Sequence, residues 1–338
     1  MLYFVAAFVL SIFVTLVMRF VARRLGIVDV PDTGRHRHRN SVPLLGGIGI
    51  FLAFWSVILY LLRFHPILGI ERIANPLIAA GVASFIIVFI GIADDILKLS
   101  PRIRLLLTSL PVVWIASVVG GGFNRITNPL GGYFVLGGAL ATLLVFVWLM
   151  GMMYTTKILD GLDGLSTGVV TIGAMLIYLL TESPKFFQPN VGLVSLIFTG
   201  ACLGFLVFNF KPASIFLGES GSLFIGFMLG MLAVLGGGKL ATALLVMAIP
   251  VFDLARVMYR RWRRHQPLFI GDREHLHFQL LDSGMSERSV VLFYYVLAAG
   301  AGILTLVLES YQKILALVFL ALALGLISWR INTGRFPR

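Results

Sequence analysis

The chain has 338 residues, of which 59% are hydrophobic and 12% are charged, and its mean hydropathy is +0.97. A soluble domain of this length cannot bury so much apolar surface, so the composition excludes a soluble globular protein and indicates a membrane protein. The net charge of +12 does not predict nucleic-acid binding, because Lys and Arg also mark the cytoplasmic loops of membrane proteins. Cys202 is the single cysteine, which excludes an intramolecular disulfide.

Apolar stretches recur along the whole chain, and a helix of about 20 apolar residues crosses roughly 30 Å of hydrocarbon. We therefore predict an all-α fold, a polytopic membrane bundle of 10 or 11 helices that forms one domain over residues 1–338. The expected spans, in chain order, are 2–20, 44–63, 76–93, 104–120, 133–152, 165–181, 191–208, 222–236, 240–257, 289–308 and 314–329.

The charged residues predict the orientation of this bundle. Eleven spans place the termini on opposite sides, and with the N-terminus outside, 21 of the 27 Lys and Arg residues fall on the cytoplasmic side with the C-terminus. Twelve of the 15 acidic residues fall on that side too, which the positive-inside rule does not require. We therefore expect an active site built from the cytoplasmic loops, which are residues 21–43, 94–104, 153–164, 209–221 and 258–288.

The first cytoplasmic loop is rich in Arg and His, with VPDTGRHRHRNSVPLLGG at residues 30–47. Arginine forks and imidazoles suit phosphate recognition, although an ordinary positive-inside loop has a similar composition. The candidate phosphate-binding residues of this loop are Arg35, His38 and Arg39.

The second loop begins with two adjacent acids. In GIADDILKLSPR, residues 91–102, Asp94 and Asp95 stand where an apolar span should end. Adjacent residues of a helix point about 100° apart, so a shared role requires a helix end or a turn. Interfacial water, or an ion pair with a cation such as Arg104, would also accommodate these carboxylates. We include Arg104 among the candidate substrate contacts.

The third loop, YTTKILDGLDGLS at residues 154–166, holds two Asp-Gly pairs. Asp160 and Asp163 are three residues apart and would share a face of a helical turn, while the glycines allow a backbone or a ligand to approach closely. The spacing does not match an EF-hand loop.

The last two loops add another carboxylate and a histidine pair. In FNFKPASIFLGESGS, residues 208–222, Glu219 lies at an expected helix N-terminus, where an N-capping role is the simpler interpretation. In GDREHLHFQL, residues 271–280, His275 and His277 lack the spacing of a zinc site, so we expect them to contact phosphate or to transfer protons.

The five loops together predict a site for a divalent cation and phosphate. Mg2+ takes oxygen ligands, retains waters, and is usually held by one or two carboxylates together with substrate phosphates. Mn2+ could take the same ligands. The cation would balance the clustered acids, and the Arg and His side chains would face the phosphates.

Four motifs occur in a fixed order on the predicted cytoplasmic face: GIADDILKLSPRIRL, LDGLDGL, NFKPASIFLGESGS and DREHLHFQLLDSG. Together they resemble the polyprenyl-phosphate N-acetylhexosamine-1-phosphate transferases. The resemblance implies a Mg2+-dependent transfer of a sugar 1-phosphate from a UDP-sugar to a polyprenyl phosphate, with release of UMP, in the bacterial inner membrane. It implies that the paired aspartates lie near the lipid phosphate and the metal, and that Glu219 binds the metal.

The resemblance also assigns the donor site. It implies that His275 and His277 contact the diphosphate region, and that the nucleoside pocket is lined by Asp160, Asp163, Asn209 and Phe216. Five positions differ from the family pattern: Glu219 replaces an Asp, Lys157 and Tyr154 each replace an Asn, Phe278 replaces a third His, and His36 stands where a Lys is common. At the first of these Asn positions, Lys157 is a candidate phosphate contact instead.

A lipid phosphate oxygen would then attack the β-phosphorus of the donor, and the site must neutralise two anions. We expect Glu219, Asp95 and Asp94 to hold Mg2+, and Asp94 to position or deprotonate the lipid phosphate. His275, His277 and an Arg of the first loop would stabilise charge on the departing UMP. A covalent phospho-aspartate route stays open.

The favoured donor is UDP-GlcNAc, and transfer of phospho-MurNAc-pentapeptide is the alternative within the family. From another class, an ion-coupled transporter would place its carboxylates near the bilayer midplane rather than at span ends. The sequence does not decide whether the protein forms a homodimer.

Overall fold

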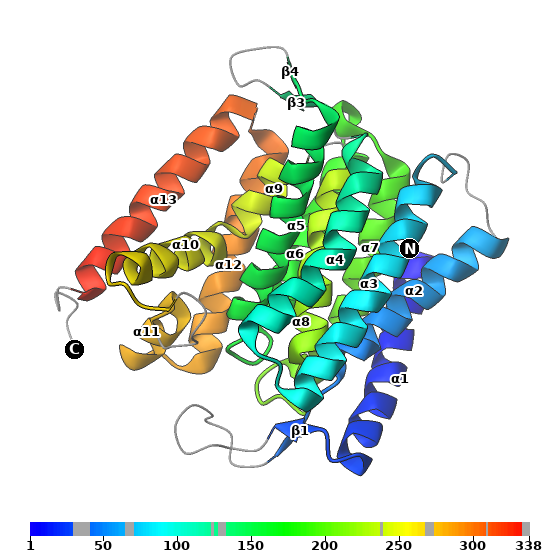
Figure 1. Ribbon diagram of the computed structural model, residues 1–338, viewed down its shortest axis with the longest axis horizontal. Helices are drawn as coiled ribbons and strands as arrows, with labels where there is room; N and C mark the ends of the chain where they lie inside the picture. Colours follow the sequence, from blue (N-terminus) through cyan, green and yellow to red (C-terminus); the bar gives the residue numbers. More distant parts are fainter. Residues whose placement is uncertain are drawn as a thin grey trace.

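The computed structural model describes residues 1–29, 41–64, 71–122, 125–127, 133–236, 239–267, 274–308 and 310–332. Over these ranges the chain is a helical bundle, so the all-α prediction is confirmed, with two short antiparallel strand pairs (Figure 1). The elements are α1 (Leu2–Arg24), β1 (Val28–Asp29), β2 (Val42–Pro43), α2 (Gly46–Phe64), α3 (Glu71–Leu97), α4 (Pro101–Gly120), β3 (Arg125–Thr127), β4 (Tyr133–Val135), α5 (Gly138–Leu159), α6 (Leu165–Glu182), the 3-10 turn η1 (Pro184–Phe186), α7 (Pro189–Asn209), α8 (Gly218–Leu235), α9 (Leu240–Val246), α10 (Ala248–Arg263), α11 (Leu276–Asp282), α12 (Glu287–Val307) and α13 (Ser310–Asn332).

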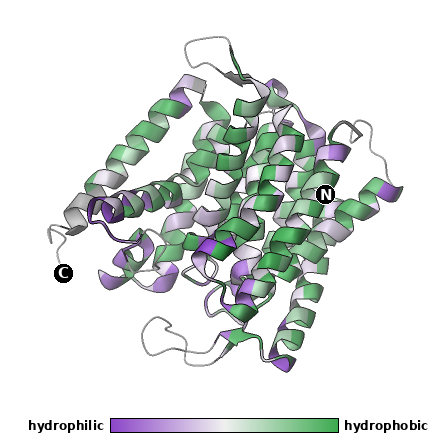
Figure 2. Ribbon diagram, in the orientation of Figure 1, coloured by the Kyte–Doolittle hydropathy of each residue, from purple (hydrophilic) through white to green (hydrophobic). Residues whose placement is uncertain are grey.

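In the described ranges, nine helices are long and apolar enough to cross a membrane, and the pair α9 and α10 adds a tenth if it counts as one bent span. The chain is therefore a multi-pass membrane protein. The eleventh expected span lies in α13, whose apolar described part is Tyr311–Ala323. Figure 2 shows apolar residues along most of the bundle and hydrophilic residues gathered toward the helix ends.

The span expected over 240–257 is broken into two helices. The chain bends by 76° between α9 and α10. Pro250 lies in the first turn of α10, where its missing N–H is tolerated but cannot continue the α9 hydrogen-bond ladder. The second half of α10 carries Arg256, Arg260, Arg261 and Arg263. Hydrocarbon would not accommodate these charges, which explains why α10 turns away from the direction of α9.

Two helices extend further than the sequence predicted. The expected span 76–93 is part of α3, which continues to Leu97, so Asp94 and Asp95 lie on its last turns. The expected span 133–152 begins in β4 and forms α5 from Gly138, and α5 continues to Leu159 and includes Lys157. Both helices extend because the polar residues after the apolar stretch still permit helical backbone.

The helix α8 lies at the centre of the bundle and packs against α2, α3, α5 and α6. Close backbone contacts fix its first turn. A Cβ atom added at Gly91 of α3 would lie 2.2 Å from the Cα atom of Ser220, and one added at Gly47 of α2 would lie 2.1 Å from the Cα atom of Gly221. The start of α8 is therefore held against α2 and α3, at the same end of the bundle as the last turn of α5 and α11 (Figure 1).

Candidate active site

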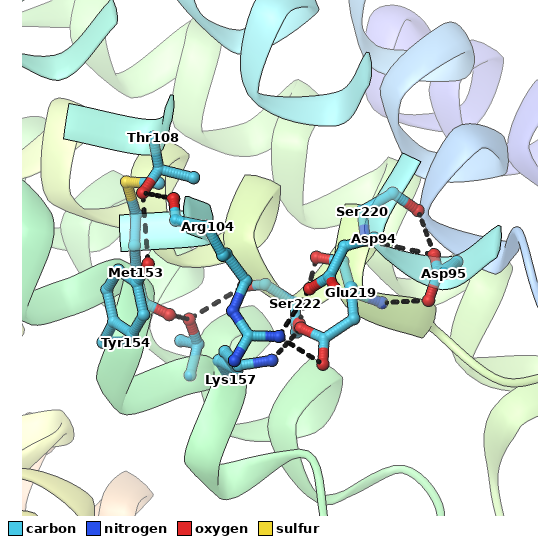
Figure 3. Close-up of polar contacts among 11 residues, drawn as sticks. Asp94, Asp95, Arg104, Thr108, Met153, Tyr154, Lys157, Glu219, Ser220 and Ser222 are labelled. Atoms are coloured by element: carbon cyan, nitrogen blue, oxygen red, sulfur yellow. Dashed lines mark hydrogen bonds and ion pairs between the residues drawn. The ribbon is translucent and has the colours of Figure 1, made fainter. Parts of the chain in front are cut away.

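Asp95 joins the end of α3 to the start of α8 (Figure 3). Its Oδ1 atom accepts a hydrogen bond from the backbone N–H of Glu219 at 2.9 Å, and its Oδ2 atom accepts from the N–H and the hydroxyl of Ser220 at 3.4 and 3.3 Å. The first N–H groups of a helix lack partners within the helix, so a buried carboxylate satisfies them well. Gly218 has φ +76°, and a Cβ there would lie 2.8 Å from Asp95 Oδ2. Asp95 therefore orients the residue that follows Gly218.

The side chains of Asp94 and Glu219 meet at Arg104, on the first turn of α4 (Figure 3). The Arg104 guanidinium nitrogen lies 2.5 Å from Asp94 Oδ2 and 3.5 Å from Glu219 Oε1. The other carboxylate oxygen of Glu219 pairs with the ammonium group of Lys157, from α5. Asp94 is buried, whereas the side chain of Glu219 keeps 29% exposure. Helices distant in sequence thus bring two carboxylates and two cations to one point.

Asp160 and Asp163 have different surroundings, although the sequence predicted a shared face. Asp163 Oδ2 accepts a hydrogen bond from the backbone N–H of Ala213 at 3.0 Å and lies 3.3 Å from the Lys211 ammonium. Asp160 follows α5, and burial together with the negative charge of Glu219 raises the pKa of its carboxyl well above the usual value. Asp163 therefore ties its loop to the segment after α7, while Asp160 is electrostatically coupled to the Glu219 cluster.

Asn209 and Phe216 shape the segment that leads into α8. The amide of Asn209 donates to the Ile215 carbonyl at 3.1 Å, and its oxygen accepts from Thr167 at 3.4 Å. The backbone N–H of Phe216 donates to the Pro43 carbonyl at 2.8 Å. The end of the first loop thus packs beside the approach to Glu219. Arg35, His38 and Arg39 lie outside the described residues.

The histidine pair is anchored by a residue that the sequence did not single out. Asp253 of α10 lies 2.8 Å from His275 Nδ1, accepts from the backbone N–H of Leu276 at 3.0 Å, and pairs with Arg256 at 2.7 Å. Its sequence signal is an acid three residues before Arg256, inside what resembled an apolar span. Asp253 fixes both the His275 ring and the start of α11.

His277 faces the loop that carries Asp160. Its ring is stacked on His275 with a centroid distance of 5.8 Å, and a Cβ at Gly161 would lie 2.7 Å from its Nε2 atom. Burial, with a smaller contribution from His275, lowers the pKa of His277 to about 3. Among the described residues, its buried Nε2 atom finds no hydrogen-bond partner. His277 is therefore a neutral ring against the Asp-Gly loop.

Tyr154 also lies at the cluster, although the sequence marked it only as a departure from the family pattern and we assigned it no role at the site. Its hydroxyl is 3.1 Å from the Thr108 hydroxyl, which links α5 to α4 beside Arg104 (Figure 3). Its position three residues before Lys157, on the same helix face, is the sequence signal that could have identified it.

The side chains that could bind a metal ion are the carboxylates of Asp94 and Glu219. Within the described ranges, no three His, Cys, Asp or Glu side chains form a ready metal site. Both oxygens of Asp95 accept hydrogen bonds from the first turn of α8, whereas Asp94 and Glu219 face cations. Two converging carboxylates are a ligand set suited to Mg2+ when phosphate oxygens and water complete its shell.

Comparisons with known proteins agree with these motifs. The model of glycosyl transferase family 4 matches residues 77–237, which include the Asp94 and Glu219 cluster. A Bacillus subtilis protein named "Probable undecaprenyl-phosphate N-acetylglucosaminyl 1-phosphate transferase" is 31% identical over 92% of this chain and 86% of its own. A Mycobacterium tuberculosis decaprenyl-phosphate N-acetylglucosaminephosphotransferase is 30% identical, over 86% and 78%. A Yersinia pestis undecaprenyl-phosphate alpha-N-acetylglucosaminyl 1-phosphate transferase is 27% identical, over 94% and 86%.

Proposed function

Because the chain belongs to glycosyl transferase family 4, we propose that it transfers N-acetylglucosamine 1-phosphate from UDP-GlcNAc to a polyprenyl phosphate and releases UMP. A phosphate oxygen of the lipid attacks the β-phosphorus of the donor. The bond from that phosphorus to the bridging oxygen breaks, and its electron pair leaves with UMP. The named activities of the relatives favour this reaction over peptidoglycan-precursor transfer and over ion transport.

The proposed reaction is supported by one cluster of charged side chains at the ends of apolar helices, formed by Asp94, Arg104, Lys157 and Glu219. Two phosphate-bearing substrates repel one another, so their reaction requires fixed positive charge and alignment. Arg104 and Lys157 supply cations, and Asp94 supplies a buried carboxylate that can orient or deprotonate the lipid phosphate. The neighbouring apolar spans suit an acceptor whose tail stays in the bilayer.

We assign Asp94 and Glu219 as the residues that would hold Mg2+, with Asp95 as a positioning residue that fixes the helix start beneath Glu219. Bound Mg2+ would supply positive charge against the diphosphate. Mn2+ could take the same oxygen ligands.

The histidine pair completes the donor side. Asp253 accepts the Nδ1 proton of His275, which leaves Nε2 of that ring available to the diphosphate. Neutral His277 packs on Gly161 and positions the Asp-Gly loop. We place this site on the cytoplasmic face of the bacterial inner membrane, where a water-soluble UDP-sugar is available.

The test is UMP release by the purified protein from UDP-GlcNAc, with and without undecaprenyl phosphate and Mg2+. We expect release only when both are present. The variants Asp94→Asn and Glu219→Ala should reduce it at least 100-fold, in line with the loss of a proton-transferring or charge-stabilising group. UMP release without a lipid acceptor, or near-normal turnover in either variant, would refute the assignment.

A further inference from the structure

Lys157 and Glu219 form an ion pair at the carboxylate cluster, and both side chains are partly exposed. The ammonium of Lys157 contacts Glu219 Oε2, and Arg104 lies 3.5 Å from Glu219 Oε1. Both oxygens of Glu219 therefore face cations. A divalent metal that takes Glu219 as a ligand must first remove at least one of these contacts.

The two cations are held differently. Arg104 is anchored by Asp94 at 2.5 Å, so it keeps a carboxylate partner when it leaves Glu219. Within the described part of the chain, Glu219 is the hydrogen-bonding and ion-pairing partner of Lys157. The side chain of Lys157 keeps 15% exposure and ends a flexible four-carbon stem, so its ammonium can swing toward a new anion. Lys157 is the cation that can exchange.

We propose that Lys157 is an exchangeable counter-cation: it holds Glu219 before ligands bind, competes with Mg2+ for that carboxylate, and when displaced supplies its charge to the donor diphosphate. This inference rests on the proposed function, because the diphosphate is that of the UDP-sugar. The exchange leaves each charge of the cluster paired, because Mg2+ replaces the ammonium on Glu219 while the ammonium pairs with a new anion.

The exchange predicts opposite effects of one substitution on two ligands. Lys157→Met removes the competitor and should bind Mg2+ on the order of tenfold more tightly. The same variant lacks the released ammonium and should bind UDP in the presence of Mg2+ on the order of tenfold more weakly. If Lys157 only supported the fold, its substitution would weaken the binding of both Mg2+ and UDP, or of neither.

The experiment uses the full-length protein in detergent and measures its thermal unfolding midpoint against Mg2+ concentration, without substrate. UDP binding at saturating Mg2+ is measured by calorimetry. Arg102→Met is the matched control, because it removes an exposed cation from the same end of the bundle. Lys157→Arg, which keeps the charge, should retain competition with Mg2+. If Lys157→Met does not fold, Lys157→Gln takes its place.

Tighter Mg2+ binding and weaker UDP binding in Lys157→Met, with Arg102→Met within twofold of the parent protein, would support the exchange. Unchanged or weaker Mg2+ binding in Lys157→Met would overturn it, as would a parent protein whose unfolding does not respond to Mg2+. These outcomes are independent of catalysis, whereas failure of the proposed function would appear as absent lipid-dependent UMP release.

Discussion

Two neighbouring aspartates of α3 perform different tasks at the scale of single residues. Both oxygens of Asp95 accept hydrogen bonds from the first turn of α8, whereas Asp94 pairs with Arg104. We therefore expect Asp95→Asn to lower the unfolding midpoint as well as activity, since an amide nitrogen cannot accept the N–H or hydroxyl bond that it faces. Asp94→Asn should keep a midpoint close to the parent value, because Arg104 still has Glu219. If both variants lowered the unfolding midpoint equally, Asp94 and Asp95 would not have these different roles.

Asp253 gives a second residue-scale prediction. Asp253→Asn replaces the acceptor for His275 Nδ1, so the ring loses its fixed tautomer and orientation. We expect kcat to fall by about 10- to 100-fold, the range typical for such supporting partners. A kcat close to the parent value would contradict this role of Asp253.

The buried ring of His277 should make the unfolding free energy depend on pH. Its pKa is lowered to about 3 by burial, below the ordinary value near 6.5, so between these values the unfolded chain binds a proton that the folded chain does not. This residue should therefore contribute a loss of about 1.4 kcal/mol of unfolding free energy for each pH unit below 6.5, until pH 3. In His277→Gln the midpoint should fall less between pH 7 and pH 5 than in the parent protein. If the midpoint fell equally in His277→Gln and in the parent protein, His277 would not be the source of this pH dependence. His265→Gln, at an exposed position, is the control.

At the scale of helices, the site depends on how closely α3 approaches α8. An added Cβ at Gly91 would lie 2.2 Å from Ser220 Cα, so Gly91→Ala must move the end of α3 away from the start of α8. We expect destabilisation of about 1–3 kcal/mol from overpacking, and a loss of transfer because Asp95 no longer reaches Glu219 N. Gly151→Ala in α5 is the matched control, since nothing lies within 4 Å of its added Cβ. Similar midpoints and activities for the two variants would refute this role of the contact.

The helices also show what sequence can predict. Apolar stretches located most spans, because a run of about 20 apolar residues has few alternatives to a membrane helix. Hydropathy could not show that α3 and α5 continue past their apolar stretches, since helix ends depend on tertiary contacts such as Asp95 with Glu219 N. It also could not identify Asp253, whose role appears only when the bend after α9 brings α10 beside His275.

At the scale of the whole molecule, loops distant in sequence meet at one end of the bundle (Figure 1). The motifs predicted the chemistry of these loops, but the separate contacts of Asp160 and Asp163 could not be predicted without the packing of the segment after α7.

The orientation of the molecule in the membrane can be tested directly, because the only native cysteine, Cys202, is buried. We expect a membrane-impermeant maleimide to label Phe187→Cys, but not Arg102→Cys, in intact cells. The reverse pattern would contradict a cytoplasmic active site.

In the proposed reaction, the β-phosphate of the donor travels to the lipid together with the sugar. The most direct test gives the purified protein UDP-GlcNAc labelled with 32P at the β-phosphate and 3H in the sugar, with undecaprenyl phosphate and Mg2+. Both labels should enter the lipid extract in equal molar amounts, matched by UMP in the aqueous phase. Tritium in the lipid with the phosphorus label left in aqueous UDP would contradict it, because the sugar alone would then have been transferred.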